Sequence, residues 1–429
     1  MITLPPALLH LDFRRLWISM LCSGLAMQMA QVAIGWQVYT IHHSAFDLGL
    51  IGLAEFVPVP LLALPAGQLA DRLPRVTVVI VWGFCDAAVM GLLLLVTLHG
   101  AHLLWPFLGL AVLTGTLAAI GNPAGRSLTP EIVPAELLTG AIALRSIGGQ
   151  VSTIGGPALG GLLFAIRPEV VYIAAITLLV VSSLILVPIT RPERASRAGN
   201  APRMDELFAG IRFIRGTPVI LGAITLDLFA VLFGGAVALL PLFAKSVLHT
   251  GPFGLGVLRS MVAVGALAAG ILIAHRQIGR HAGRTLLVVV GVFGASMVVF
   301  GLSRWFWLSA LALAVSGFVD MFSMNIRQTT VVLATPNRLL GRVNAVEGVF
   351  IGASNELGAF ESGVAAALLG AVPAVVAGGA LTIALALVWP RVFPRLAGVD
   401  RLEDLSPAGL GEVLPVGRRR PPAAPEPAD

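Results

Sequence analysis

The chain has 429 residues, of which 57% are hydrophobic and only 12% are charged, and its mean hydropathy is +0.92. No soluble core needs that much apolar sequence, so the composition excludes an ordinary soluble enzyme or binding module. The net charge of +6 requires no nucleic-acid partner, because arginines facing the headgroups of a lipid bilayer account for it.

Apolar segments of membrane-spanning length fill most of the sequence. About 20 apolar residues are enough to cross the hydrocarbon layer as a helix. The twelve predicted spans, in chain order, are Arg15–Ile41, Phe46–Ala70, Val76–Leu98, Leu103–Gly125, Leu137–Ala165, Val170–Ile189, Val219–Ala244, Phe253–Ala274, Thr285–Gly301, Trp305–Ile326, Val343–Leu369 and Pro373–Val392. We therefore predict an all-α polytopic membrane protein with twelve transmembrane helices.

The basic residues predict which side each loop faces. Arginines concentrate in alternate loops and in the C-terminal tail, whereas the intervening loops carry only Arg167, Lys245 and Arg304. By the positive-inside rule we expect both termini to be cytoplasmic. The 27 arginines against one lysine are typical of a high-GC genome. We therefore expect the membrane to be the inner membrane of a bacterium.

Two similar stretches indicate an internal duplication. Thr129–Gly140 is echoed around Leu333–Arg342, and aligning Pro134 with Pro336 gives an offset of 202 residues (336 − 134). Six predicted helices separate the copies, which favours two parallel six-helix halves. The domains that we expect are a first bundle (1–190), a cytoplasmic linker (191–216), a second bundle (217–393) and a flexible, proline-rich cytoplasmic tail (394–429).

The loop between the second and third predicted helices carries a charged motif. It resembles the loop that joins helices two and three in transporters of the major facilitator superfamily. The matching residues are Gly67, Asp71, Arg72 and Arg75. Pro74 replaces the usual glycine and Val76 the final basic residue. The resemblance implies a conformational latch, in which the Asp71 carboxylate accepts hydrogen bonds in one state only.

The fifth predicted helix contains a second motif. Its run Gly156-Pro157-Ala158-Leu159-Gly160-Gly161 resembles the Gly-Pro-x-x-Gly-Gly signature of the exporting, antiport branches of the superfamily. Small residues let helices approach closely, and a proline allows a bend where the bundle must rock. Ordinary close packing of membrane helices also explains such a run.

With Leu340–Asn344, these motifs resemble most the group of enterobactin and macrolide exporters, the transmembrane secretion effectors. The resemblance implies a proton-driven efflux pump for bulky amphipathic small molecules, siderophore-like or drug-like, without a cofactor. One family element is missing, since the fourth predicted helix contains no arginine before Arg126. The coupling groups must therefore lie elsewhere or be absent.

Charged residues inside the predicted helices are functional candidates, because each costs about 2.5 to 3.5 kcal/mol to insert. A carboxyl group in a low-dielectric cavity takes up a proton more readily than in water, which proton coupling requires. By depth in their helices, Asp86 and Asp227 are the first candidates for proton coupling, followed by Glu55 and Glu356. A helical projection places Glu356 away from the polar face of the eleventh helix.

Arg145 and Glu347 occupy equivalent positions in the two repeats (347 − 145 = 202). Two interpretations stay open: an ion pair across the bundle that holds the inward gate shut, or separate solvation at the headgroup level. Four amide side chains are candidates for lining a substrate cavity. They are Gln28 and Gln31 in the first helix and Asn344 and Asn355 in the eleventh.

The sequence contains no nucleotide-binding loop, dinucleotide fingerprint, nucleophile elbow or metalloprotease motif, so we predict no enzyme activity. His42, His43, His99 and His102 cluster in the first two predicted outer loops, where exposed loop histidines are favoured over the alternative of a metal site. The two cysteines lie within predicted helices and suggest neither a disulfide framework nor a zinc site. We expect a monomeric secondary transporter that exchanges protons for a small amphipathic organic substrate. Lipid-like cargo such as lysophospholipid remains an alternative, and a polytopic membrane enzyme is much less favoured.

Overall fold

The structure is a computed structural model that describes residues 5–62, 73–100, 102–189, 204–275 and 280–405. All regular structure within these ranges is helical. The first half comprises the short α1 (Pro6–Leu9), then α2 (Leu11–His42), α3 (Ala45–Phe56), α5 (Arg75–Leu98), α6 (Trp105–Ile132), α7 (Leu138–Ile166) and α8 (Pro168–Leu186). The second comprises α9 (Met204–Gly216), α10 (Pro218–Gly234), α11 (Leu240–Leu242), α12 (Pro252–His275), α13 (Ala282–Leu302), α14 (Phe306–Ala334), α15 (Asn337–Leu369), α16 (Ala371–Val392) and α17 (Pro394–Ala397).

Twelve spans are present, as predicted. Eleven segments of the described chain are long and apolar enough to cross a membrane. The twelfth span is α15, whose 33 residues are long enough but are interrupted by five charged residues. Those charges make α15 the least lipid-like of the long helices. Two of them, Glu347 and Glu356, belong to the charged clusters described below.

The seventh span is broken near its end. After α10 the chain forms a 3₁₀ turn over Ala236–Leu239, the short α11 and a π turn over Phe243–Val247. Gly235 and Pro241 explain the interruption, because neither favours a continuous helix. Irregular backbone at membrane depth is tolerated where it borders a cavity, and this segment does so.

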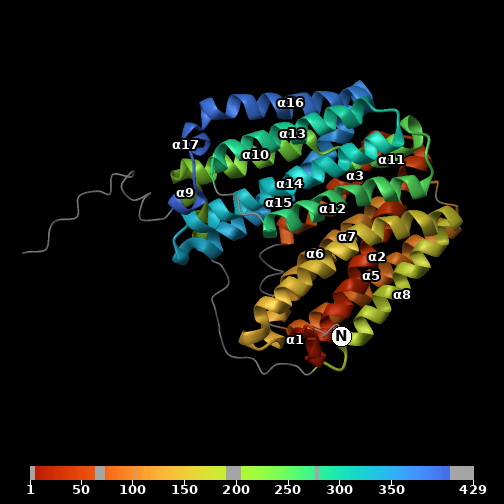
Figure 1. The fold of residues 1–429 in the computed structure, drawn as a ribbon. Helices are drawn as coiled ribbons and strands as arrows, with labels where there is room; N and C mark the ends of the chain where they lie inside the picture. Colours follow the sequence, from red (N-terminus) through yellow and green to blue (C-terminus); the bar gives the residue numbers. More distant parts are fainter. Residues whose placement is uncertain (1–4, 63–72, 101, 190–203, 276–279, 406–429) are drawn as a thin grey trace, which may run out of the picture.

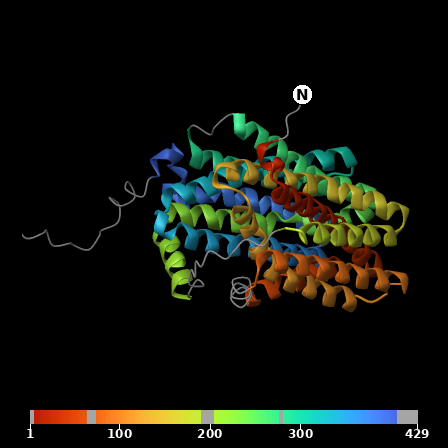
Figure 2. The same ribbon diagram turned by 90° about the horizontal axis from the view of Figure 1, so that it is seen from below.

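The helices run side by side and end at two opposite faces of the bundle (Figures 1 and 2). We call the end that carries α1, α9 and α17 the linker face, and the other end, with the short α2–α3 and α7–α8 connections, the loop face. Within the first half α2 packs on α7 and α8, and within the second α13 packs on α14 and α16. The two halves meet mainly through two helix pairs, α3 with α15 and α7 with α12.

The contacts between the halves gather toward the loop face. Tyr39 Oη lies 2.6 Å from Ser246 Oγ there, and a Cβ added at Gly161 would lie 2.5 Å from the carbonyl oxygen of Pro252. Toward the linker face the halves spread apart (Figure 1). The molecule is therefore closed at the loop face and divergent at the linker face.

One expectation about the tail needs correction. Residues 394–405 are not a free tail: Leu396 and Leu405 are buried, and the backbone N–H of Ala282 donates to the carbonyl of Asp400 over 3.0 Å. The Asp400 carboxylate also accepts from the His281 N–H over 2.9 Å. This segment caps the start of α13, because the first N–H groups of a helix need external acceptors. Residues 406–429 lie outside the described ranges.

Candidate functional site

A cavity of about 480 Å³ lies between the two halves. Helices α2, α3, α5 and α6 of the first half contribute to its wall, as do α10 and α12 to α15 of the second. Apolar side chains form most of the lining, among them Met27, Ile51, Phe107, Phe293 and Met297. Its size and character are those of a site for an organic molecule.

Eight polar or charged side chains interrupt this apolar wall, and two of them are the hydroxyl groups of Thr114 and Ser316. Those used below are Gln31, Glu55, Arg259, Asp320, Asn355 and Glu356. Asp320 is exposed although it lies within the bundle, because its surface opens on the cavity. The lining thus combines one guanidinium with three carboxyl groups.

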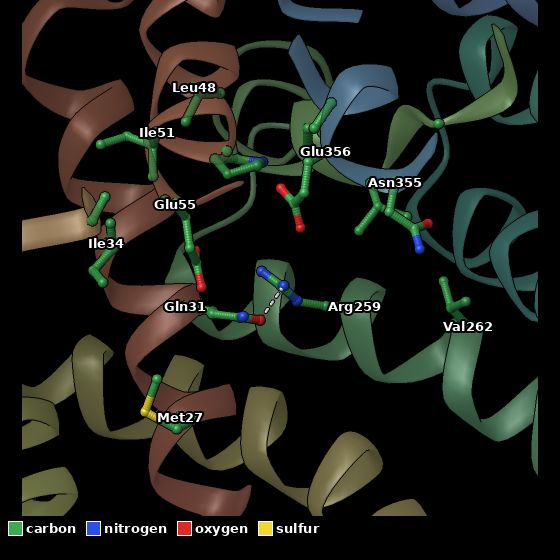
Figure 3. Close-up of a pocket in the computed structure, with 18 of the residues that line it drawn as sticks. Met27, Gln31, Ile34, Leu48, Ile51, Glu55, Arg259, Val262, Asn355 and Glu356 are labelled. Atoms are coloured by element: carbon green, nitrogen blue, oxygen red, sulfur yellow. Dashed lines mark hydrogen bonds between the residues drawn. The ribbon is translucent and has the colours of Figure 1, made fainter. Parts of the chain in front are cut away.

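Four of these residues form what we call the ionic centre: Gln31, Glu55, Arg259 and Glu356 (Figure 3). Arg259 Nη2 donates a 2.6 Å hydrogen bond to Gln31 Oε1. The guanidinium also interacts electrostatically with Glu55 and Glu356, whose carboxylates point toward it from different sides (Figure 3). Gln31 and Glu55 belong to the first half, and Arg259 and Glu356 to the second. The ionic centre therefore crosses the interface.

Small residues bring the two halves close enough for this arrangement. A Cβ added at Gly52 of α3 would lie 3.1 Å from Glu356 Oε2, so the Glu356 carboxylate rests against the other half. Further along α15, a Cβ added at Gly363 would lie 2.9 Å from the carbonyl oxygen of Ala45 on α3. Such close backbone approach is what glycines permit between membrane helices.

A second charged cluster lies wholly within the second half, and we call it the buried triad. Arg327 of α14 forms ion pairs with Asp227 of α10 and, from Nε to Oε1 over 3.5 Å, with Glu347 of α15. All three side chains are buried. Asp320 interacts electrostatically with both Asp227 and Arg327, so it connects the triad to the cavity. Buried charges persist in membrane helices when they are paired in this way.

The proton-coupling candidates fall in three places. Glu55 and Glu356 line the cavity. Asp86 of α5 is buried and interacts electrostatically with Glu55, but it is not among the lining residues. Asp227 lies in the buried triad instead of the cavity. The helical projection of α15 was wrong for Glu356, which faces the cavity beside Asn355.

The four amide candidates divide evenly. Gln31 and Asn355 line the cavity. Gln28 packs on α7, since a Cβ added at Gly156 of α7 would lie 2.4 Å from the Cβ of Gln28. Asn344 is exposed nearer the linker face and is not a lining residue.

Arg145 and Glu347 do not pair in this conformation. Arg145 Nη1 donates to the Gly125 carbonyl and to Thr129 Oγ1, each over 3.1 Å. Glu347 lies against Arg327 instead. Because the halves diverge toward the linker face, each charged residue finds partners in its own half. A pair across the bundle requires a conformation in which that face is closed.

Of the loop motif, only Arg75 lies within the described residues. Gly67, Asp71 and Arg72 of the loop motif lie outside the described residues, while Arg75 forms an ion pair with Glu131 at the end of α6.

The fifth-helix motif faces two partners. A Cβ at Gly160 would lie 2.8 Å from the Cα of Met29 on α2. Gly161 faces α12, and a Cβ at Gly256 of α12 would lie 2.3 Å from the Pro157 carbonyl. Gly156 and Gly160 therefore serve packing within the first half, whereas Pro157 and Gly161 form the contact between halves.

Three charged residues of these clusters were not predicted from the sequence as site residues: Arg259, Asp320 and Arg327. The tenth span was predicted to end at Ile326, which placed Arg327 in a loop, but α14 continues to Ala334. The signal for the longer helix is the apolar run Val331–Leu333 before Pro336. A helix usually stops just before a proline, and not at its first charged residue.

Comparisons with known proteins agree with this architecture. A family model described as transmembrane secretion effector matches residues 3–407. The enterobactin exporter EntS of Citrobacter koseri is 28% identical over 398 residues, covering 88% of this chain and 92% of the relative. EntS of Shigella dysenteriae serotype 1 is 28% identical over 380 residues, covering 83% and 88% respectively.

Solved transporter structures share the fold. A bacterial homologue of the human lysosomal transporter Spinster, in an inward-facing and occupied conformation, has a TM-score of 0.70 at 14% identity, covering 90% of this chain and 97% of that one. The nucleoside transporter NupG has a TM-score of 0.67 at 14% identity, covering 89% and 99%. A bacterial homologue of the iron transporter ferroportin, in an inward-facing state, has a TM-score of 0.67 at 17% identity, covering 91% and 99%. These identities establish the fold alone, and the fold is that of major facilitator transporters, as predicted.

Proposed function

Because the chain belongs to the transmembrane secretion effector family of major facilitator transporters, it is a membrane transporter and not an enzyme, and we propose that it exports a bulky amphipathic organic molecule in exchange for protons. The observation that carries this proposal is the cavity between the halves. Its wall is mostly apolar, and residues of the ionic centre reach into it from both halves. A rocking motion of the halves would therefore change the site itself.

The apolar lining supports an amphipathic cargo. Methionine and aromatic side chains such as Met27, Met90, Phe107 and Phe293 adapt to irregular organic surfaces. Polar groups are few and come from Gln31, Asn355, two hydroxyl side chains and the charged residues. The enterobactin exporters among the relatives make a siderophore the first cargo to test.

Protons are the proposed coupling ion because carboxyl groups face the cavity. Glu55 and Glu356 lie on opposite sides of the interface, and Asp86 is buried beside Glu55. Taking a proton at such a group removes a buried charge, so protonation and conformation are linked. Asp86 remains a proposed accessory proton site.

The proposed orientation places the linker face in the cytoplasm of a bacterial cell, at the inner membrane. The arginine bias of the sequence supports it. The divergent linker face would then admit cargo from the cytoplasm. We further propose that the Asp71 loop acts as a latch that closes this face in another state, and that the protein works as a monomer.

Reconstituted vesicles test the proposal directly. The purified protein is placed in liposomes with a pH-sensitive dye inside, and enterobactin or lysophosphatidylcholine is added outside. Proton movement that depends on enterobactin supports the assignment. Movement with the lysophospholipid alone would favour lipid-like cargo, and no proton movement during measurable flux of either compound would contradict proton coupling. Liposomes that carry the Glu361→Gln variant are a matched control, since Glu361 lies on α15 but does not line the cavity.

A further inference from the structure

The ionic centre gives one guanidinium two carboxylates in different halves of the molecule. Arg259 and Glu356 move together as parts of the second half, whereas Glu55 belongs to the first. In this conformation the hydrogen bond of Arg259 goes to Gln31, and the guanidinium makes no direct ion pair with either carboxylate. Arg259 thus lies between two carboxylates and is ion-paired with neither of them in this conformation.

The two attractions have different mechanical consequences. Attraction between Arg259 and Glu55 crosses the interface and draws the halves together near the loop face. Attraction between Arg259 and Glu356 stays within one half and contributes nothing to closure. The Glu356 carboxylate also lies against Gly52 of α3, so its charge repels Glu55 across the interface. Charges in a cavity are screened less than in bulk water, so these differences count.

We propose that Arg259 is a positioning residue with alternating partners: bound to Glu55 it holds the loop face closed, and bound to Glu356 it releases that face. A proton that reaches Glu356 removes the competing acceptor and the repulsion, so Arg259 turns to Glu55 and the loop face closes. Loss of that proton toward the linker face returns Arg259 to Glu356 and loosens the closure. This order of events is the one that exchange of protons for exported cargo requires, so the inference rests on the proposed function.

Two further carboxyl groups lie near the ionic centre. Asp320 lines the same cavity from the second half, and Asp86 interacts with Glu55 from the first. Both are present in every variant compared below. They therefore contribute to the ratio of open to closed loop faces in all variants, and the test rests on the difference between the Glu55 and Glu356 substitutions.

The test is a distance measurement across the loop face. Cys22 and Cys85 are replaced by serine, and spin labels are attached at His99→Cys and Arg304→Cys. These exposed positions lie in loop-face connections, one in each half. Pulsed electron spin resonance then gives the populations of closed and open loop faces. The measurement needs neither cargo nor a proton gradient, so its failure is separate from failure of the proposed function.

Two substitutions that each remove one carboxylate should act in opposite directions. Glu55→Gln is expected to raise the open-to-closed ratio by at least about fivefold, and Glu356→Gln to lower it by a similar factor, the low end of typical coupling effects. Glu361→Gln, on the same helix but outside the cavity, should leave the ratio unchanged.

The role of Arg259 itself is tested by a double substitution. In an Arg259→Gln background the opposite effects of Glu55→Gln and Glu356→Gln should disappear, which a purely structural role would not predict. If Arg259→Gln does not fold, the comparison of the two single variants still decides. Shifts in the same direction, or no shift in either variant, would overturn the proposal.

Discussion

Arg259 on α12 and Gln31 on α2 join the two halves of the protein inside its cavity through a hydrogen bond of 2.6 Å. The bond links a charged donor to a neutral acceptor. Hydrogen bonds to charged groups contribute about 1.5 to 3 kcal/mol. It therefore stabilises the conformation that is closed at the loop face, and it gives Arg259 a resting partner while neither carboxylate holds it.

Replacing Gln31 by leucine should weaken that closure without changing any charge. The expected result is a larger open population at the loop face in the His99 and Arg304 distance measurement, in the same direction as Glu55→Gln. Gln28→Leu is the matched control, because Gln28 packs on α7 outside the cavity. An equal effect of both substitutions would show that packing on α2, and not the bond to Arg259, is responsible.

The buried triad should be a stability element of the second half. Arg327→Met leaves Asp227 and Glu347 buried without their cation, and breaking a buried pair in this way costs about 3 to 5 kcal/mol. We expect a clear fall in the thermal unfolding midpoint in detergent. Adding Asp227→Asn and Glu347→Gln to Arg327→Met should recover much of the loss. An unchanged midpoint for Arg327→Met alone would mean that the triad is solvated and carries little stability.

The neighbouring glycines Gly160 and Gly161 should respond differently to the same change. Gly160→Ala presses on Met29 within the first half, so it should lower the unfolding midpoint, with a cost of about 1 to 3 kcal/mol for overpacking. Gly161→Ala presses on Pro252 across the interface, so it should push the halves apart at the loop face. Thermal unfolding and the loop-face distance, measured on both variants, separate the two effects. Identical behaviour would assign the whole motif to ordinary packing.

The fold could be predicted from the sequence because lipid imposes a simple rule: long apolar runs must be helices. The predicted limits agree closely with α5 and α12, whose ends coincide with the ends of apolar runs. They fail at α14, where Arg327 continues a helix inside the protein. Hydropathy reports how well a segment suits lipid. A charged residue that is paired inside the bundle lowers the hydropathy of its segment although the helix continues through it.

The site was only partly predictable, for a related reason. Depth along a helix put Asp86 and Asp227 first, but neither lines the cavity, and Asp227 faces a neighbouring arginine. Glu55 and Glu356, which do line the cavity, were the second choices. Which way a buried charge points depends on the packing of other helices, here α14 against α10. The assembly of Arg259 with Glu55 and Glu356 could not be predicted, because its members are more than 90 residues apart and no motif links them. The Asp71 latch stays a prediction.

Proton coupling through the cavity carboxylates is most directly tested by comparing two transport modes in one variant. Vesicles that contain Glu356→Gln should lose accumulation of enterobactin driven by a pH gradient, yet keep exchange of labelled for unlabelled enterobactin, which needs no net proton movement. Glu361→Gln, the matched control on the same helix, should retain both modes. Full gradient-driven accumulation in Glu356→Gln, and equally in Glu55→Gln, would contradict the account.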